Sequence, residues 1–336
     1  MHELALPLLV GLIVIALAFD FLNGLHDAAN SIATVVSTKL LSPVMAVLFA
    51  AAGNFAAYWL VGLKVAETVG KGIIDKDVVT PAVVFGALVG AMVWNVITWL
   101  KGIPSSSSHA LIGGLLGAGI SHAGFAAVES SGTTKTIVAI FLSPTIGFFI
   151  AMLLMLITSW LFRGFQPKRA DGVFKILHLC SSAAYSISHG GNDAQKTMGV
   201  ITVLLYSTGY MQGEFHVPGW VVLSCYTAIA MGTLSGGWRI IKTMGNKLTR
   251  LNHHSGFCAS TAGSIVVFGA SALGIPVSTT HAITGSVVGV GAAKRASAVR
   301  WGVASRVVIA WFITIPASAA VAAITYGVTR GIALLF

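Results

Sequence analysis

Two clusters of hydroxyl side chains interrupt otherwise apolar stretches of the sequence. The first runs from Ser105 to Ser108 and the second from Ser278 to Thr280, and each precedes an apolar stretch that reads as a helix. Hydroxyls at a helix start lie beside free backbone amides and the positive end of the helix dipole, which together suit an oxyanion. Helix capping alone is the alternative. The predicted oxyanion-binding residues are Ser105, Ser106, Ser107, Ser108, Ser278, Thr279 and Thr280.

Four ionisable residues lie within long apolar stretches: Asp20, Asp27, Asp193 and Lys196. Placing an ionisable side chain inside a membrane costs at least about 2.5 to 3.5 kcal/mol on insertion scales, so such residues are candidates for function. Asp27 and Asp193 occupy equivalent positions in an internal repeat described below, which favours a shared site over two carboxylates that only cap helix breaks. Asp20 has Ser186 at the corresponding position, and the sequence leaves a structural and a functional role equally open for it.

Three histidines could exchange a proton near these groups, because histidine titrates near physiological pH. His26 directly precedes Asp27, whereas His109 and His281 end the two hydroxyl clusters. Packing is the alternative for His109 and His281. The sequence has no zinc-protease motif, phosphate-binding P-loop, serine nucleophile elbow or Cys-x-x-Cys pair. We therefore predict that the chain is not an enzyme and holds no resident metal or cofactor.

The composition is typical of a protein that lies in a lipid bilayer. Of 336 residues, 56% are hydrophobic and 9% are charged, against about 25% charged residues in soluble domains. Long apolar stretches recur, each near the roughly 20 residues that a helix needs to cross the hydrocarbon layer. The net charge of +10 comes from basic residues spread between these stretches, so it fits the positive-inside rule rather than nucleic-acid binding.

Two pairs of motifs recur in the same order along the chain. The segment 24–31 matches 190–197 at an offset of 166 residues (190 − 24), and 102–113 matches 274–285 at an offset of 172 residues (274 − 102). Two matches at nearly the same offset indicate two related halves. We predict a first inverted repeat over residues 1–165, a cytoplasmic connector over 166–175 and a second inverted repeat over 176–336.

Each half is predicted to contain a span broken at the aspartate motif, a second span, a re-entrant helical hairpin and a final span. Pro104 and Pro276 place the hairpin turns at the hydroxyl clusters, because proline cannot continue the preceding helix. An odd number of crossings in each half makes the repeats inverted. The predicted fold is an all-α polytopic membrane protein with two inverted-topology repeats, and the hairpin tips are expected near mid-membrane.

Basic residues collect on one side of this arrangement. Arg163, Lys168, Arg169 and Lys175 lie where the two halves meet, in the predicted connector or just before it. Cytoplasmic loops of membrane proteins are enriched in lysine and arginine, so this side is predicted to be cytoplasmic. Both termini are then expected outside.

The aspartate and hydroxyl motifs together resemble those of the inorganic phosphate transporter (PiT) family, and the resemblance covers essentially the whole chain. The family signature is a Gly-x-Asn-Asp-x-x-Asn-like segment in each half, matched by Asp27 and Asn30 in the first half and by Asn192 and Asp193 in the second. The resemblance implies secondary active uptake of inorganic phosphate with a coupling cation, by alternating access, in a multi-pass homodimer of the bacterial cytoplasmic (inner) membrane. It also implies that the four matching residues take part in cation coupling.

Two residues depart from the signature. His26 replaces the first motif asparagine, and Lys196 stands where the second half would carry its last asparagine. In sodium-coupled members the signature residues resemble cation ligands, so a protonated lysine would repel sodium or take its place. We therefore place Lys196 among the coupling residues and predict proton coupling, as in the bacterial low-affinity phosphate carriers, with phosphate able to move as a neutral complex with a divalent metal.

Two alternatives share the predicted fold. One is a sulfate permease of the same family, and the other is a sodium-coupled phosphate symporter with sodium around Asp27 and Asn30. Hydrogen phosphate donates as well as accepts hydrogen bonds, so a carboxylate near the site favours phosphate over sulfate. A passive anion channel is an alternative from another class, and it would show no accumulation driven by a gradient.

Overall fold

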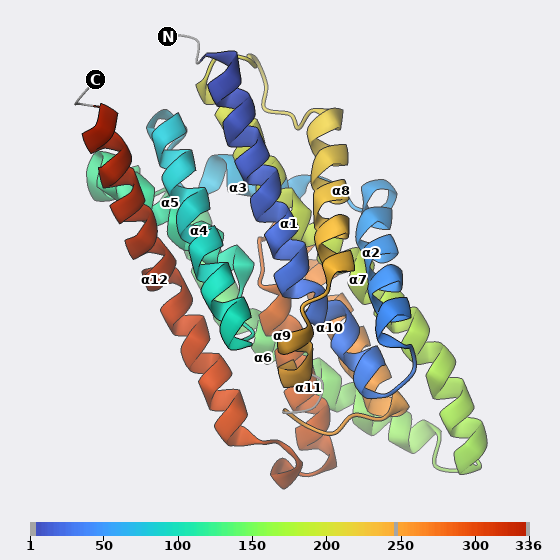
Figure 1. Ribbon diagram of the computed structural model, residues 1–336. Helices are drawn as coiled ribbons and strands as arrows, with labels where there is room; N and C mark the ends of the chain where they lie inside the picture. Colours follow the sequence, from blue (N-terminus) through green and yellow to red (C-terminus); the bar gives the residue numbers. More distant parts are fainter. Residues whose placement is uncertain (1–4, 245–247, 334–336) are drawn as a thin grey trace.

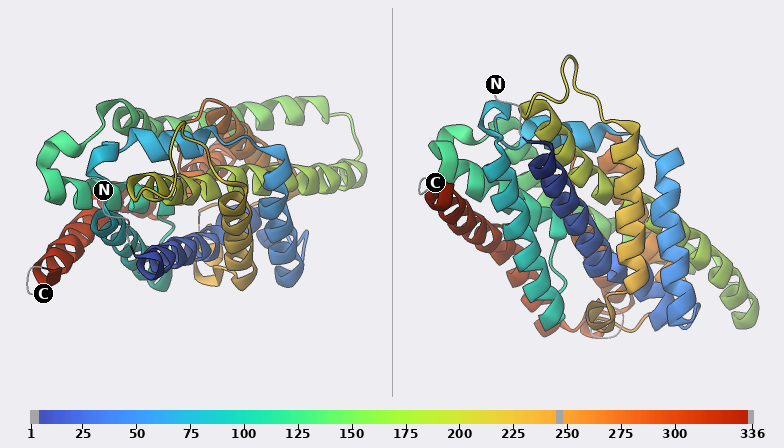
Figure 2. Two further views of the ribbon diagram at one scale, coloured as in Figure 1. Left: turned by 90° about the horizontal axis from the view of Figure 1, so that it is seen from above. Right: turned by 45° about the horizontal axis from the view of Figure 1, so that its top comes forward.

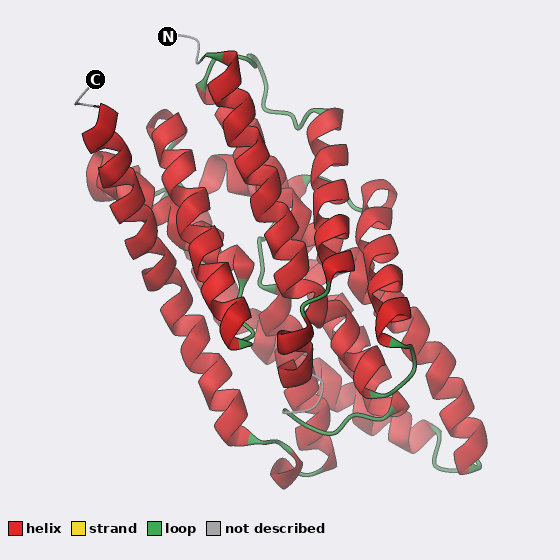
Figure 3. Cartoon of the chain, in the orientation of Figure 1, coloured by secondary structure: helices red, strands yellow, loops and turns green. Residues whose placement is uncertain are grey.

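The protein is almost entirely helical over the residues that its computed structural model describes, which are 5–244 and 248–333. No strand occurs among these residues, and the single β-bridge joins Ile74 to Val128. Seven of the described helices are long and apolar enough to cross a membrane. Figure 3 shows them as one bundle joined by short loops. The prediction of an all-α polytopic membrane protein is confirmed.

The two halves contain the same series of six α-helices among the residues that the structure describes. The first half consists of α1 (Leu6–Ser37), α2 (Pro43–Leu60), α3 (Lys64–Gly72), the 3-10 helix η1 (Lys76–Val78), α4 (Pro81–Lys101), α5 (Ser107–Ala123), η2 (Gly124–Ala127) and α6 (Ser130–Leu161). The second half consists of α7 (Pro167–Ser207), α8 (Gly219–Ser235), α9 (Trp238–Lys242), α10 (His253–Ala272), α11 (Thr279–Lys294), η4 (Ala296–Ala298) and α12 (Trp301–Ala333).

The two series run in opposite directions through the bundle. In Figure 1, α1 descends from the top of the view whereas its counterpart α7 ascends, and α6 descends whereas α12 ascends. The start of α1 and the end of α12 consequently lie at the same end of the molecule. Figures 1 and 2 both place α12 on one flank of the bundle and α2 on the other. This arrangement is what an inverted repeat produces.

One prediction is wrong: the spans that carry the aspartate motifs are not broken. α1 and α7 are continuous α-helices of 32 and 41 residues that run straight through the motifs. Their motif glycines serve a close crossing instead, because a side chain on Gly24 would collide with the backbone of Ile229 and one on Gly190 with the backbone of Asn54. The residues assigned to the connector, 166–175, form the cap and first turns of α7.

Two helical hairpins turn inside the bundle. α4 and α5 form the first, α10 and α11 form the second, and the two enter from opposite ends (Figure 1). Gly102 and Gly274 open the turns with φ of 63° and 68°, a left-handed conformation that glycine adopts at no steric cost. Pro104 and Pro276 follow these glycines, and the second helix of each hairpin begins only three residues after its proline, α5 at Ser107 and α11 at Thr279. The predicted re-entrant hairpins are therefore present, with their tips at the hydroxyl clusters.

The two halves interlock instead of lying side by side. α5 packs on α12 and α11 packs on α6, so each hairpin lies against the final helix of the other half. α1 likewise packs on α8, and α7 packs on α2. Small residues permit the close approach, as in many membrane helix pairs. Gly285 of α11, for example, faces the carbonyl of Pro144 in α6.

Short helices α3 and α9 each fasten the hairpin turn of the other half, and we call these contacts the α3 clamp and the α9 clamp. In the α9 clamp, Arg239 donates to the carbonyl oxygen of Leu100 at 2.6 Å and Thr243 donates to that of Gly102 at 3.0 Å. In the α3 clamp, Lys64 donates to the carbonyl oxygen of Ala272 at 3.1 Å. Both cations therefore lie at a helix C-terminus, where the dipole favours positive charge.

The crossing of α11 and α6 generates a stability prediction. We expect Gly285→Ala to lower the free energy of unfolding by about 1 to 3 kcal/mol, because the new methyl group overlaps the Pro144 carbonyl. The measurement is thermal unfolding of the purified protein in detergent. Gly327→Ala is the control, because this α12 glycine has open space around it and alanine is the better helix former. Equal melting temperatures for the two variants would contradict the expectation.

Candidate functional site

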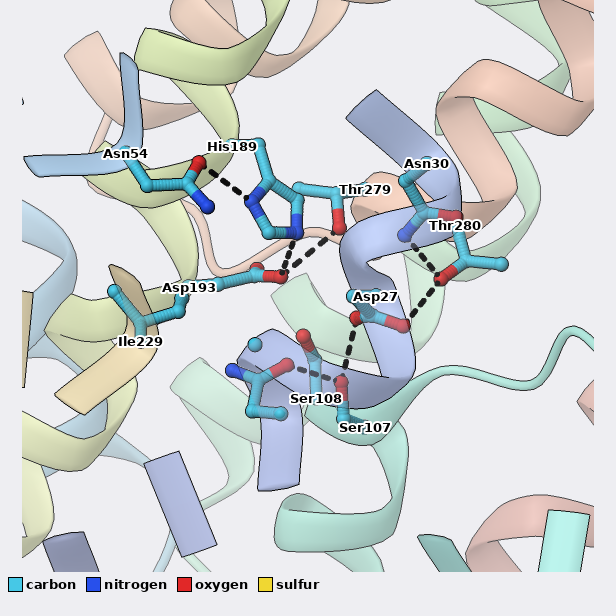
Figure 4. A network of polar contacts seen from close by, with 12 residues as sticks. Asp27, Asn30, Asn54, Ser107, Ser108, His189, Asp193, Ile229, Thr279 and Thr280 are labelled. Atoms are coloured by element: carbon cyan, nitrogen blue, oxygen red, sulfur yellow. Dashed lines mark hydrogen bonds and ion pairs between the residues drawn. The ribbon is translucent and has the colours of Figure 1, made fainter. Parts of the chain in front are cut away.

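The two motif aspartates lie between the N-termini of α5 and α11, in the interior of the bundle (Figure 4). Ser107 Oγ donates to Asp27 Oδ2 at 2.6 Å, and Thr279 Oγ1 donates to Asp193 Oδ2 at 3.0 Å. Thr280 Oγ1 adds a longer contact of 3.4 Å to Asp27 Oδ1. All five side chains are buried. The long helices α1 and α7 thus each place a carboxylate at the N-terminus of the second helix of a hairpin, which is α5 for Asp27 and α11 for Asp193.

The signature asparagines take different directions. Asn30 Nδ2 donates to Thr280 Oγ1 at 2.9 Å, so Asn30 belongs to the same polar network as Asp27. Asn192 Nδ2 donates instead to Ser271 Oγ at 2.9 Å, in the last turn of α10. The structure therefore brings Asn30 into the site, whereas the amide of Asn192 points to the hairpin arm.

Lys196 connects three elements with its buried ammonium group. Its Nζ donates to Asp193 on its own helix, to Ser108 Oγ at the start of α5, and to the carbonyl oxygen of Val277 in the second hairpin turn at 2.8 Å. An ammonium group has three donors, and all three are used here. A buried charge is tolerated only with such partners, so the three contacts of Lys196 stabilise the arrangement in which both hairpin tips reach the centre of the bundle.

The seven predicted oxyanion residues divide into two groups. Ser106 and Ser278 are helix caps, since their hydroxyls accept from the amides of His109 and His281 at 3.2 and 3.1 Å. Ser105 donates to Thr98 Oγ1 at 2.9 Å, away from the carboxylates. The structure therefore brings together four hydroxyls around the two carboxylates and the ammonium group: Ser107, Ser108, Thr279 and Thr280.

The three predicted proton-relay histidines also separate. His26 Nδ1 lies 2.8 Å from Asp27 Oδ1, and its Nε2 lies 3.0 Å from Thr98 Oγ1. His109 and His281 instead contact each other edge to face, with ring centroids 4.5 Å apart, and His281 stacks on Trp311. Among the described contacts, only His26 of the three bonds a site carboxylate.

Sequence reasoning missed His189. Its Nε2 lies 3.2 Å from Asp193 Oδ2, and its Nδ1 lies 3.1 Å from Asn54 Oδ1, with the ring fully buried. The repeat contains a signal for it, because Asn23 stands at the corresponding position of the first half. Asn23 Oδ1 faces the site too, 2.5 Å from Ser107 Oγ.

Asp27, His189 and Asp193 could together hold a cation. One ligand atom from each residue lies within 4.8 Å of the others, and all three are buried. Two carboxylates with an imidazole suit several divalent metals, and carboxylate oxygens also suit sodium. The positive charge of Lys196 beside Asp193 lowers the affinity for any such ion. The site can therefore balance carboxylate charge with a bound cation, with protons or with its own lysine.

The Lys196 contacts generate a stability prediction. We expect Lys196→Met to lower the free energy of unfolding by about 3 to 5 kcal/mol, because Asp193 then stays buried without its main counter-charge. The double variant Asp193→Asn with Lys196→Met should recover part of this loss, as a double-mutant cycle in detergent would measure. Lys175→Met is the control in the same helix, since its pair with Asp171 is half exposed and contributes less than about 1 kcal/mol. Equal losses for Lys196→Met and Lys175→Met would contradict the expectation.

Similar sequences, a similar solved structure and a family model all relate this chain to phosphate transporters. A protein of Rhizobium meliloti (strain 1021), described as a probable low-affinity inorganic phosphate transporter, is 61% identical over 96% of this chain and 97% of its own length. A protein of Bacillus subtilis (strain 168) with the same description is 43% identical over 96% of this chain and 98% of its own length. A solved structure titled as the sodium-dependent phosphate transporter superposes with a TM-score of 0.87 at 26% identity, covering 97% of this chain and 99% of that one.

The family comparison reproduces the internal repeat. The model of the phosphate transporter family matches twice, over residues 23–171 and 163–322, and each match contains one aspartate motif and one hydroxyl motif. The matching proteins are transporters, and the chain is accordingly not an enzyme. On these matches, the chain belongs to the phosphate transporter family.

Proposed function

We propose that this chain takes up inorganic phosphate across the bacterial cytoplasmic membrane by proton-coupled symport. The family and the phosphate transporters among the similar proteins support phosphate as the cargo. The observation that carries the choice of coupling ion is the position of Lys196, whose ammonium group bonds Asp193 and both hairpins. Because the Lys196 ammonium group already neutralises Asp193 and occupies the space beside it, a sodium ion gains little by binding there.

Phosphate recognition is assigned to the hydroxyls at the two hairpin tips. Ser107, Ser108, Thr279 and Thr280 come from the first turns of α5 and α11, where free amides and the helix dipoles also favour an anion. In the structure these hydroxyls donate to the carboxylates and accept from the lysine, so a bound anion replaces part of that network. Hydrogen phosphate can donate back to Asp27 or Asp193, whereas sulfate has no proton to donate.

A neutral metal-phosphate complex also fits this chemistry. The cluster of Asp27, His189 and Asp193 supplies carboxylate and imidazole ligands beside the hydroxyls. A divalent metal held there would offset the charge of the phosphate it accompanies. We assign the metal, if carried, to the cargo and not to the resting protein.

Alternating access follows from movement of the hairpins. To admit phosphate from one end of the bundle, one tip has to leave its carboxylate, which breaks either the contact of Ser107 with Asp27 or that of Thr279 with Asp193. Because the halves interlock, each hairpin moves with the final helix of the opposite half.

We further propose that both termini face the outside, because the basic residues where the two halves meet mark the cytoplasmic side. We also propose that the protein is a homodimer, as the resemblance to the inorganic phosphate transporter family implies.

The coupling ion can be measured directly. Protein reconstituted in liposomes should accumulate radiolabelled phosphate under an inward proton gradient, and excess sulfate should not compete. Equal pH on both sides with an inward sodium gradient should give only equilibration. Strict dependence on sodium would contradict proton coupling, strong competition by sulfate would contradict the cargo, and passage without saturation would indicate a channel.

The carboxylates give the second functional prediction. We expect Asp27→Asn and Asp193→Asn each to lower uptake by about 10- to 100-fold, because each change weakens charge-assisted hydrogen bonds worth about 1.5 to 3 kcal/mol. Uptake in liposomes is compared at equal amounts of inserted protein. Asp171→Asn is the control, since this aspartate is half exposed at the start of α7. Full activity in both site variants would sink the assignment.

A further inference from the structure

A third carboxylate lies inside the bundle without a hydrogen bond of normal geometry. Asp20 is two helical turns before Asp27 on α1, its side chain is fully buried, and the donors that lie closest to hydrogen-bonding reach of its oxygens are Thr197 and Asn23. Buried polar atoms of native proteins are nearly always paired. An unpaired carboxylate at the centre of a membrane bundle is therefore an exception that calls for a role.

The groups that face Asp20 come from two helices. Thr197, Asp193 and Lys196 approach it from α7, and Cys225 and Tyr226 approach it from α8. The hydroxyls of Thr197 and Tyr226 are themselves buried and unpartnered. Asp20 consequently lies beside a few buried polar groups, within a part of the bundle that is otherwise apolar.

The charge state of Asp20 follows from this environment. An ionised carboxylate that is fully buried in an apolar interior, with no hydrogen bond of normal geometry, is costly, so the group takes up a proton instead. The nearest positive charge, Lys196, is already bonded to Asp193. A metal ion is a poor occupant, because it requires several oxygen ligands, the neighbouring carboxylate of Asp193 is already bonded to Lys196, and that ammonium group repels a cation.

Asp20 is also connected to the transport site. Asn23 lies beside it on α1, and Asn23 Oδ1 is 2.5 Å from Ser107 Oγ, the hydroxyl that also contacts Asp27. On the other side, Thr197 directly follows Lys196. When a hairpin tip withdraws, Lys196 loses Ser108 or Val277 as a partner. Its ammonium group can then turn to Asp20 and stabilise the ionised carboxylate, which releases the proton.

We propose that Asp20 is the residue that carries the coupling proton, taking it up when Lys196 is bonded to Asp193 and releasing it when a hairpin opens. This inference rests on the proposed proton-coupled function. It gives Asp20 a role separate from binding phosphate, because no hydroxyl of the hairpin tips contacts Asp20 among the described hydrogen bonds.

The test separates exchange from accumulation. An asparagine imitates the protonated carboxyl group, so Asp20→Asn should keep phosphate exchange across the liposome membrane at equal pH within about twofold of wild type. It should at the same time lose accumulation under an imposed proton gradient. Ser186→Ala is the matched control at the corresponding position of the second half, where Ser186 Oγ donates to the Ser182 carbonyl, and it should keep both activities.

Each other outcome has a defined meaning. Wild-type protein that shows no exchange or no proton-driven accumulation refutes the proposed function itself. With an active wild type, Asp20→Asn protein that still accumulates phosphate, or that loses exchange as well, overturns the role of Asp20. If Asp20→Asn does not purify as a monodisperse protein, Asp20→Glu replaces it and should shift the pH profile of accumulation. A profile identical to that of Ser186→Ala overturns the proposal.

Discussion

A buried positive charge constrains the whole centre of this protein. Lys196 cannot stay ionised within an apolar bundle unless its three donors are satisfied, and its partners come from α7, α5 and the second hairpin turn. Both hairpins must therefore reach the bundle centre at once. The interlocked packing of α5 on α12 and α11 on α6 supplies the rigid frame that brings them there.

The inverted repeat supplies a symmetric scaffold, and the chemistry resides in its departures from symmetry. Asp27 and Asp193 are equivalent and make equivalent contacts with hydroxyls of opposite hairpins. Asn23 occupies the position in the first half that His189 occupies in the second. In the same way, Asn30 corresponds to Lys196 and Asp20 corresponds to Ser186. In each of these pairs one half carries an ionisable side chain and the other a neutral one, so the groups that can hold a charge or a proton stand at particular positions.

Much of this architecture could be predicted from the sequence, because paired motifs and prolines reveal duplicated hairpins directly. The continuity of helices α1 and α7 could not be predicted from the sequence. A glycine that allows two helices to cross closely looks the same in the sequence as a glycine that breaks a helix. The division of Ser106 from Ser107 likewise depends on the direction in which each hydroxyl points. His189 required comparison of positions just outside the motifs, where the residue types no longer match.

The α3 and α9 clamps differ in one respect that affects how such a carrier works. Thr243 adds a second hydrogen bond to the hairpin turn at the α9 clamp, whereas its counterpart Thr68 donates to Lys64 within its own helix. One hydrogen bond contributes about 1 kcal/mol, or roughly fivefold in an equilibrium constant. Under the alternating access proposed above, we therefore expect the hairpin at the α3 clamp to release more readily, so that the empty carrier opens more often toward the α3 face. Ion and phosphate gradients alone still determine the direction of net flux. The two faces would nevertheless differ in their apparent affinity for phosphate and in the rate at which the carrier opens to each of them.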